Sequence, residues 1–374
     1  MRFVVKIGSN LLTRPDNSLN TEFISQMTAQ IAELHKKGHE PIIVTSGAVA
    51  AGRKSITFKK ESKTIPYRQA LAAVGQTFLL ETYQDNFAKY GIVIGQVLLT
   101  LDDLKQHDHF LSTYNTLDLL LKMRVIPILN ENDVTTFNEN KFGNNDKLSG
   151  HIASLLTAET LIMLTDVDGL YDADPRSNPE AKLIQTVDHI TAKLKAAAKG
   201  SGTSKGIGGM LEKLKAAEYA NASGVKVWIA RGGVPNVLVD LIEGKKHHGT
   251  LFTTKASPRE ARRRWFQLNL KQSAALHVDE GAVAALTTKG KSLLPAGIRF
   301  VEGHFKRGDI VSMLDPTGKK IGFGKINYDS SAVETLKGAQ TDKIERLLGY
   351  TLGDEIIGRD NMVICLGNVE KNPK

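Results

Sequence analysis

The stretch spanning residues 125–150 carries side chains suited to binding a small polar molecule. It opens with a short apolar run, 125–129, and breaks at once into Asn130-Glu131-Asn132-Asp133. A second polar cluster, Gly143-Asn144-Asn145-Asp146-Lys147, precedes a helix-like segment at 148–156. Amides and carboxylates buried without partners cost about 1–3 kcal/mol each, so these groups must be solvated or satisfied by a ligand. Asn and Asp also form turns, but two such clusters beside apolar elements favour a pocket for a ligand with an amine and carboxylates.

Lys6 is a candidate for phosphate chemistry because it lies in an apolar strand pattern, 2–7, that Gly8-Ser9-Asn10 follows. A glycine lets backbone N–H groups approach an anion, and a fixed ammonium beside such a loop suits a transferring phosphoryl group. A lone lysine in a strand also commonly points to solvent. A second small-residue loop, Thr45-Ser46-Gly47-Ala48, is equally typical of a tight strand-to-helix turn.

A Gly-rich loop at residues 205–213, KGIGGMLEK, leads into a helical pattern. Backbone N–H groups at such a helix start can cover phosphates, with Lys213 in the first turns. The chain has neither a Walker A motif nor a GxGxxG fingerprint, so a P-loop or Rossmann nucleotide site has no direct support. Asp166 and Asp168 are weak candidates for metal ligands, since acidic residues are common where loops begin.

Strand and helix patterns alternate along the first 230 residues. Apolar strands separated by helices predict an α/β fold with a mainly parallel sheet covered on both faces. Ligands of such sheets bind at the carboxyl ends of the strands, and this rule gathers Gly8, Ser46, residues 130–133 and Thr165-Asp166 at one edge. The expected strands are 2–7, 41–45, 92–99, 125–129, 160–164 and 225–230, and the expected helices are 23–34 (with Asn20 as N-cap and Gly38 at its end), 70–88, 113–123, 148–157 and 208–222.

The pattern changes after about residue 255. A basic segment containing Arg262-Arg263-Arg264 reads as a linker, and short strands with turn signals follow it: LHVDEGAVAAL, KGKSLLPAGI, and two runs joined by Pro316-Thr317-Gly318. The last of these is a hairpin signal. We therefore expect a catalytic domain at 1–256, a linker at 257–272 and a small β-rich barrel at 273–366.

Composition limits the class of protein. A chain of 374 residues is long enough for two domains, and 41% hydrophobic and 24% charged residues are ordinary for a soluble globular protein. No apolar run reaches 18 residues, and the first residues form a strand pattern rather than a signal peptide, so we expect a cytoplasmic protein without membrane contact. Cys365 is the single cysteine, which excludes an internal disulfide. The net charge of +9 permits an anionic partner, either nucleic acid or a phosphorylated ligand.

Several long motifs together resemble one known family. VVKIGSNLLT, IIVTSGAVAAGR, QALAAVGQ, VIPILNENDVTT with FGNNDKLSG, and LTDVDGLYDADPRSNP closely resemble the glutamate 5-kinases of the amino-acid kinase family, in order from about residue 2 to 255. The later RRRW, LHVDEGA, SLLPAGI and RGDIV segments resemble the PUA domain of the bacterial members. The resemblance implies a mainly parallel sheet sandwiched by helices, followed by a PUA-like barrel.

The resemblance also implies roles for individual residues. By position, Lys6 and Lys213 match the phosphate-contacting lysines, and Asp146 matches the aspartate that organises them. The glutamate-binding positions match Ser46, Asp133 and Asn145, and the ATP-contacting positions match Lys6, Gly8, Thr165, Asp166, Ile207, Gly208, Gly209, Met210, Leu211, Glu212 and Lys213. The family loop typically reads GTGGMxTK, so Ile207 replaces a hydroxyl and Glu212 sits beside Lys213. Asn10 stands where Ser is usual, and no side chain is assigned as a metal ligand.

The implied activity is ATP-dependent phosphorylation of the side-chain carboxylate of L-glutamate, with Mg2+, as the first step toward proline. The same resemblance implies feedback inhibition by proline and a homo-oligomer. Two alternatives remain at this point: another amino-acid kinase acting on a different carboxylate, carbamate or phosphate acceptor, or an RNA-binding PUA protein. ATP consumption across candidate acceptors distinguishes the first alternative, and salt-dependent RNA binding distinguishes the second.

Overall fold

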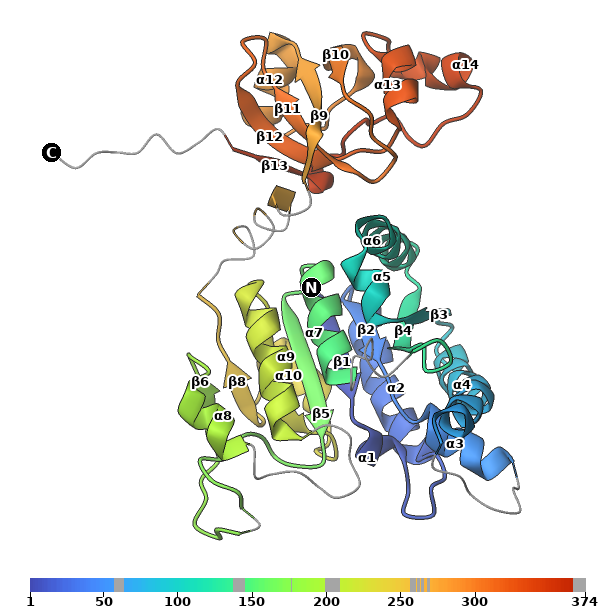
Figure 1. The fold of residues 1–374 in the computed structure, drawn as a ribbon, viewed down its shortest axis with the longest axis vertical. Helices are drawn as coiled ribbons and strands as arrows, with labels where there is room; N and C mark the ends of the chain where they lie inside the picture. Colours follow the sequence, from blue (N-terminus) through green and yellow to red (C-terminus); the bar gives the residue numbers. More distant parts are fainter. Residues whose placement is uncertain are drawn as a thin grey trace, which may run out of the picture. The chain divides into compact units, whose positions relative to one another are not determined.

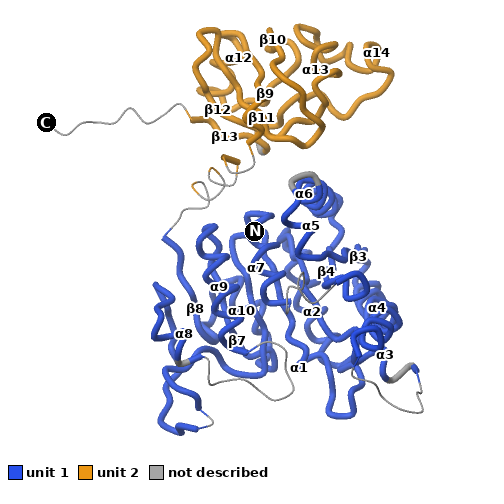
Figure 2. The backbone as a smooth tube through the Cα atoms, in the orientation of Figure 1, with its two compact units in different colours: residues 1–258 blue, residues 259–374 orange. Residues whose placement is uncertain are grey.

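The computed structural model describes residues 1–56, 64–136, 145–175, 177–198, 209–255 and 270–365, together with 260, 263, 266 and 267. The chain divides into two compact units, residues 1–258 and 259–374 (Figure 2). Each unit has its own apolar core. The predicted linker, 257–272, lies largely outside the described residues. No helix among the described residues is both long and apolar enough to cross a membrane.

An eight-stranded sheet forms the centre of the first unit (Figure 1), in the order β3-β4-β2-β1-β5-β7-β8-β6. Every neighbouring pair is parallel except β7 with β8. The predicted mainly parallel α/β sheet is therefore confirmed. The strands are β1 (Arg2–Ile7), β2 (Glu40–Val44), β3 (Ile94–Leu99), β4 (Ile126–Glu131), β5 (Thr160–Thr165), β6 (Thr186–Val187), β7 (Lys226–Arg231) and β8 (Thr250–Phe252).

Helices cover both faces of this sheet. Alternate side chains of β1 point to opposite faces, and those of Phe3, Val5 and Ile7 share one core with three helices, α2 (Thr21–Lys36), α4 (Ile65–Ala88) and α10 (Val237–Glu243). The even-numbered residues face the other layer, where Arg2 pairs with Asp118 of α6. That layer contains α6 (His107–Lys122), α7 (Asn145–Leu155) and α9 (Met210–Ala222), and the shorter helices are α1 (Ser9–Leu12), α3 (Ala48–Ser55), α5 (Leu101–Lys105) and α8 (Ala192–Ala198).

The ends of α2 agree with the sequence. The Asn20 side chain accepts a hydrogen bond from the Phe23 N–H at 3.2 Å, which caps the helix. Gly38 follows the helix with φ of +89°, a left-handed conformation that favours glycine.

Several predicted boundaries were wrong. Helix α6 begins at His107 rather than at 113. Strand β4 does not break before Asn130, because Asn130 and Glu131 continue the ladder opposite Leu98 and Leu99 of β3. Helix α7 begins at Asn145 rather than at 148, so Asn145, Asp146 and Lys147 form its first turn, where a carboxylate is favoured by the helix dipole. Helix α4 begins at Ile65 rather than at 70, with a proline in its first turn.

The second unit contains a five-stranded sheet in the order β10-β9-β11-β12-β13. The predicted hairpin joins β11 to β12, and the Asp315 carboxylate accepts hydrogen bonds from the N–H groups of Thr317 and Lys319 in its turn. The segment LHVDEGAVAAL, predicted as strand, continues after β9 as a helix that Asp279 caps. Alanine favours helix, and this outweighed the strand pattern. The elements are β9 (Leu270–Val278), α12 (Glu280–Thr287), β10 (Ile298–Glu302), β11 (Ile310–Leu314), β12 (Lys320–Lys325), α13 (Ser330–Leu336), α14 (Ile344–Leu348) and β13 (Met362–Ile364).

Candidate active site

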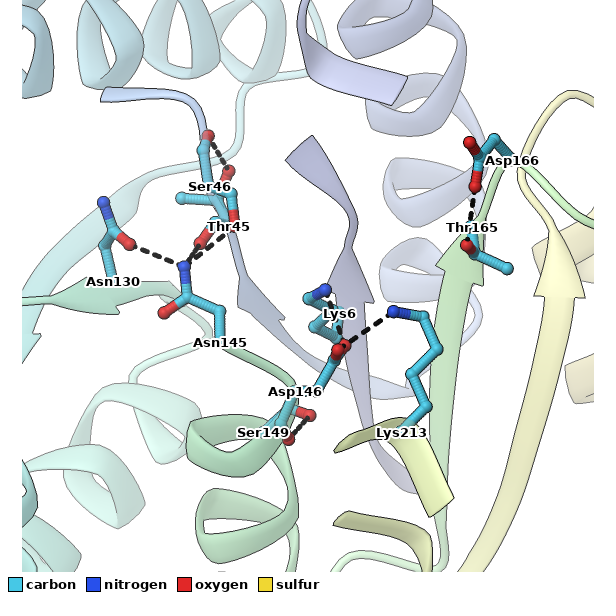
Figure 3. Close-up of polar contacts among 10 residues, drawn as sticks. All are labelled: Lys6, Thr45, Ser46, Asn130, Asn145, Asp146, Ser149, Thr165, Asp166 and Lys213. Carbon is cyan, nitrogen blue, oxygen red and sulfur yellow. Dashed lines mark hydrogen bonds and ion pairs between the residues drawn. The ribbon is translucent and has the colours of Figure 1, made fainter. Parts of the chain in front are cut away.

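Four parallel strands of the first unit end beside one another and carry the candidate residues. Lys6 of β1 lies opposite Val44 of β2, Ile7 lies opposite Leu164 of β5, and β2 in turn pairs with β4. The carboxyl ends of these strands therefore form one edge. Gly8, Ser46, Asn130 and the Thr165-Asp166 pair all lie at this edge, as the strand pattern predicted. Figure 3 shows the side chains of Ser46, Asn130, Thr165 and Asp166.

A buried carboxylate joins two lysines from distant parts of the chain. Asp146 Oδ1 lies 2.6 Å from Lys6 Nζ, and Asp146 Oδ2 accepts a hydrogen bond from Lys213 Nζ at 2.9 Å. The three residues come from β1, α7 and α9, and they are 5%, 0% and 6% exposed in that order. Figure 3 shows both lysine side chains directed at the same carboxylate. Only the folded sheet with its covering helices brings these charges together.

The electrostatics of this cluster favour an anion. Two ammonium groups and one carboxylate leave a net charge of +1 in a desolvated site, where unbalanced charge is costly. Burial lowers the pKa of Lys6, and the Asp146 carboxylate opposes this effect. Burial would raise the pKa of Asp146, but the two lysines outweigh it and the pKa is lowered, so the carboxylate stays ionised. The Ser149 hydroxyl donates to the Asp146 carbonyl at 2.6 Å and supports this first turn of α7.

The loop after β1 approaches the end of β5 closely. The Gly8 N–H donates to the Leu164 carbonyl at 3.1 Å, and a Cβ on Gly8 would lie only 3.1 Å from that oxygen. Asn10 Nδ2 donates to Asp166 Oδ2 at 2.9 Å, and the Thr165 hydroxyl donates to Asp166 Oδ1 at 3.0 Å. Burial would raise the pKa of Asp166, but these hydrogen bonds lower it. Asn10, which departs from the usual serine, thus links α1 to the loop after β5.

The start of α9 positions Lys213. Gly209 is the N-cap, and Met210, Leu211 and Glu212 form a half-buried first turn before the buried lysine. Glu212 pairs with Lys215 at 2.6 Å, so the acidic neighbour of Lys213 is directed to another partner. Ile207 and Gly208 lie outside the described residues.

A second polar cluster forms around Asn145, beside Asp146 in the first turn of α7. Its Nδ2 lies 2.6 Å from the Thr45 carbonyl, 2.8 Å from Ser46 Oγ and 2.9 Å from Asn130 Oδ1. Gly47 follows with φ of +100° and is the N-cap of α3. The small-residue loop is therefore also a tight strand-to-helix turn, which was the alternative interpretation. Ser46 and Asn145 are therefore brought together, and Asn130 joins them.

Comparison with known proteins shows the family of the chain. Residues 1–231 match the amino acid kinase family, and residues 274–348 match the PUA domain. The chain belongs to the amino acid kinase family. It is 45% identical to the glutamate 5-kinase of Thermoanaerobacter pseudethanolicus, over 97% of this chain and 98% of that protein. It is 44% identical to the glutamate 5-kinase of Geobacter sulfurreducens, over 97% of each chain.

Asp133 lies three residues after Asn130 in the chain, just beyond the end of β4. It occupies the half-buried turn that follows the strand, and its N–H donates to the Glu131 carbonyl at 2.9 Å. The sequence assigned no individual role to Thr45, Asn130, Gln76 or Tyr83, although Thr45 and Asn130 lie in stretches that it indicated as candidates. Asn130 Nδ2 donates to Gln76 Oε1 at 2.9 Å, and Tyr83 Oη lies 3.0 Å from the Thr45 hydroxyl. The available sequence signal was the seven-residue interval between Gln76 and Tyr83, which places two polar side chains on the same face of α4.

Proposed function

We propose that the chain transfers the γ-phosphoryl group of ATP to the side-chain carboxylate of L-glutamate, giving L-glutamyl 5-phosphate, the first step of proline biosynthesis. The observation that carries this proposal is the buried cluster of Lys6, Asp146 and Lys213, whose net positive charge suits a transferring phosphoryl group. The relatives named glutamate 5-kinase, similar over nearly the whole chain, support glutamate as the acceptor.

The reaction requires alignment and charge neutralisation. A carboxylate has a pKa of about 4 and is already ionised at neutral pH, so no general base is needed. One carboxylate oxygen bonds to the γ-phosphorus while the bond from that phosphorus to the bridging oxygen breaks, and ADP leaves. Charge spreads over the three oxygens of the transferring group. Lys6 and Lys213 stabilise this charge, and Asp146 holds both ammonium groups in position.

Asp146 itself does not fit as a ligand of Mg2+, because both of its oxygens already face lysines. Within the described part of the chain, no three His, Cys, Asp or Glu side chains cluster as a metal site. Mg2+ typically binds substrate phosphates, water and one or two carboxylates. Asp166, exposed at the end of β5, fits that minor role. Bound in this way, the ion would neutralise charge on the ATP phosphates.

An acceptor series tests the proposal. ADP release is measured with L-glutamate, L-aspartate, N-acetylglutamate and carbamate, and the acyl phosphate is trapped with hydroxylamine. The expected result is strong preference for L-glutamate with hydroxamate formation. Turnover with carbamate or N-acetylglutamate in preference to glutamate would refute the proposed acceptor.

Further partners form part of the same proposal. Proline shares the α-amino acid core of glutamate, so it is proposed to inhibit by competing with glutamate at or beside the Asn130–Asp146 region. A homo-oligomer is proposed because β3 is an edge strand of the sheet and Val93 and Leu98 are exposed there. Light scattering measures the size of the oligomer.

The PUA match supports an additional RNA contact, which salt-dependent binding tests. A cytoplasmic location fits these substrates.

A further inference from the structure

Helix α4 presents three polar side chains to the acceptor end of the site. Residues 69, 76 and 83 are seven apart, and seven residues return to nearly the same face of a helix. Each side chain contacts a different residue in or just after β2 or β4 at this edge of the sheet. Gln69 Nε2 donates to the Val134 carbonyl at 3.1 Å, Gln76 Oε1 accepts from Asn130 Nδ2 at 2.9 Å, and Tyr83 Oη lies 3.0 Å from Thr45 Oγ1.

The backbone fixes which residue is the donor in the hydrogen bond between Asn130 and Gln76. The Glu131 N–H can only donate, and it donates to Asn130 Oδ1 at 2.9 Å. The other end of the Asn130 amide is therefore Nδ2, a donor. This nitrogen faces Gln76, which must present its Oε1 as the acceptor.

A second backbone group fixes the orientation of Asn145. The Thr45 carbonyl can only accept, so the Asn145 amide must turn Nδ2 toward it, and the same nitrogen reaches Asn130 Oδ1 (Figure 3). The Asn145 Oδ1 then points away from these partners. It is buried, and among the described residues no donor reaches it. What Asn145 can offer a ligand is consequently an acceptor, which suits the ammonium group of an amino acid rather than a carboxylate.

We propose that Gln76 is a positioning residue that fixes the polarity of the Asn130 and Asn145 amides and thereby selects an acceptor with an α-ammonium group. This inference rests on the proposed function. Without Gln76 Oε1, Asn130 Nδ2 loses its acceptor and the side chain can turn over. Asn145 then loses one of the contacts that hold its Nδ2, and its Oδ1 is no longer held for the ligand. Lys6 and Lys213 are anchored separately by Asp146, so the ATP side of the reaction keeps its geometry.

Steady-state kinetics of three full-length variants test this role. Gln76→Leu removes the acceptor, Gln76→Glu keeps an oxygen for Asn130 Nδ2, and Gln84→Leu makes the same change at an exposed position of α4. For Gln76→Leu we expect the KM for glutamate to rise about tenfold, while kcat and the KM for ATP stay within about threefold. Gln76→Glu and Gln84→Leu should stay near wild type. A merely structural role would change both KM values together and would not be rescued by Gln76→Glu.

A double-mutant cycle provides an independent test if Gln76→Leu does not fold. In the Asn130→Asp variant, the Gln76 amide can turn over and donate its Nε2 to the new carboxylate. In the Gln76→Glu variant, the Asn130 Nδ2 can still donate to the new carboxylate. The double variant places two carboxylates face to face, so its KM for glutamate should exceed the product of the single effects by about fivefold or more. An additive cycle, or an unchanged glutamate KM in Gln76→Leu, would overturn the inference. If the proposed function were wrong, the wild-type protein would not phosphorylate glutamate, which is a different result from an unchanged KM in the Gln76 variants.

Discussion

Replacing Lys6 or Lys213 by methionine tests whether the two ammonium groups act on one phosphoryl group. Methionine keeps an unbranched apolar stem and removes the charge. Each single variant leaves one lysine on Asp146, so the charge of the cluster falls from +1 to 0 while the carboxylate keeps a partner. Loss of one preorganised charged donor typically lowers kcat by about 100-fold to 1000-fold, and 100-fold corresponds to about 2.7 kcal/mol of barrier. The glutamate KM should change little, because Asn145 and Ser46 form a separate cluster.

The assay measures kcat from ADP release at saturating ATP and glutamate for both single variants and the double variant. If both lysines stabilise one transition state, the double variant loses less than the sum of the single losses in ΔG‡. Lys215→Met is the matched control, since Lys215 lies on the same helix but is exposed. Thermal unfolding verifies that each variant is folded. A kcat near the wild-type value in either folded single variant would refute the mechanism.

Three other outcomes follow from the same geometry. Asp133→Asn should raise the KM for glutamate far more than that for ATP, because a lost charged hydrogen bond costs about 1.5–3 kcal/mol; an unchanged KM would exclude Asp133 from the pocket. A chain ending at Lys255 should fold and keep kinase activity, because the first unit has its own core and contains the catalytic cluster; a folded but inactive truncation would contradict this. In the Asp146→Asn variant, the alkaline limb of the kcat–pH profile should move to lower pH. Burial lowers the pKa of Lys6 below 10.5, and the Asp146 carboxylate opposes this effect. Without that carboxylate the pKa of Lys6 should fall further. A limb that stays in place would show that Lys6 titration does not limit turnover.

The sequence predicted the sheet and the edge at which the candidate residues gather. Apolar strands alternating with helices follow from local patterns, and the rule that ligands bind at the carboxyl ends of parallel strands then groups Gly8, Ser46 and Asp166. The pairing of Lys6 with Lys213 was not available from local pattern, because 206 residues separate them in the chain. Family resemblance supplied that pair, and the structure places both lysines on Asp146.

The errors arose where long-range partners override local preference. Asn130 and Glu131 are poor strand formers, but β3 supplies ladder partners for both. The role of α4 was hidden for a related reason. A polar side chain at every seventh position of a helix usually indicates a solvated stripe, and only the neighbouring strand ends show that Gln76 and Tyr83 have partners.

The two halves of the site are joined by one peptide bond. Asn145 and Asp146 are consecutive in the first turn of α7, and consecutive helical residues point about 100° apart. Figure 3 shows the result, with Asn145 directed to the loops of β2 and β4 and Asp146 directed to Lys6 and Lys213. In the proposed mechanism, the start of α7 therefore sets the distance between Asn145, which orients the acceptor, and Asp146, which positions the two lysines. Phosphoryl transfer depends on in-line alignment, so a rigid helix turn, rather than two separate loops, is the element suited to fix it.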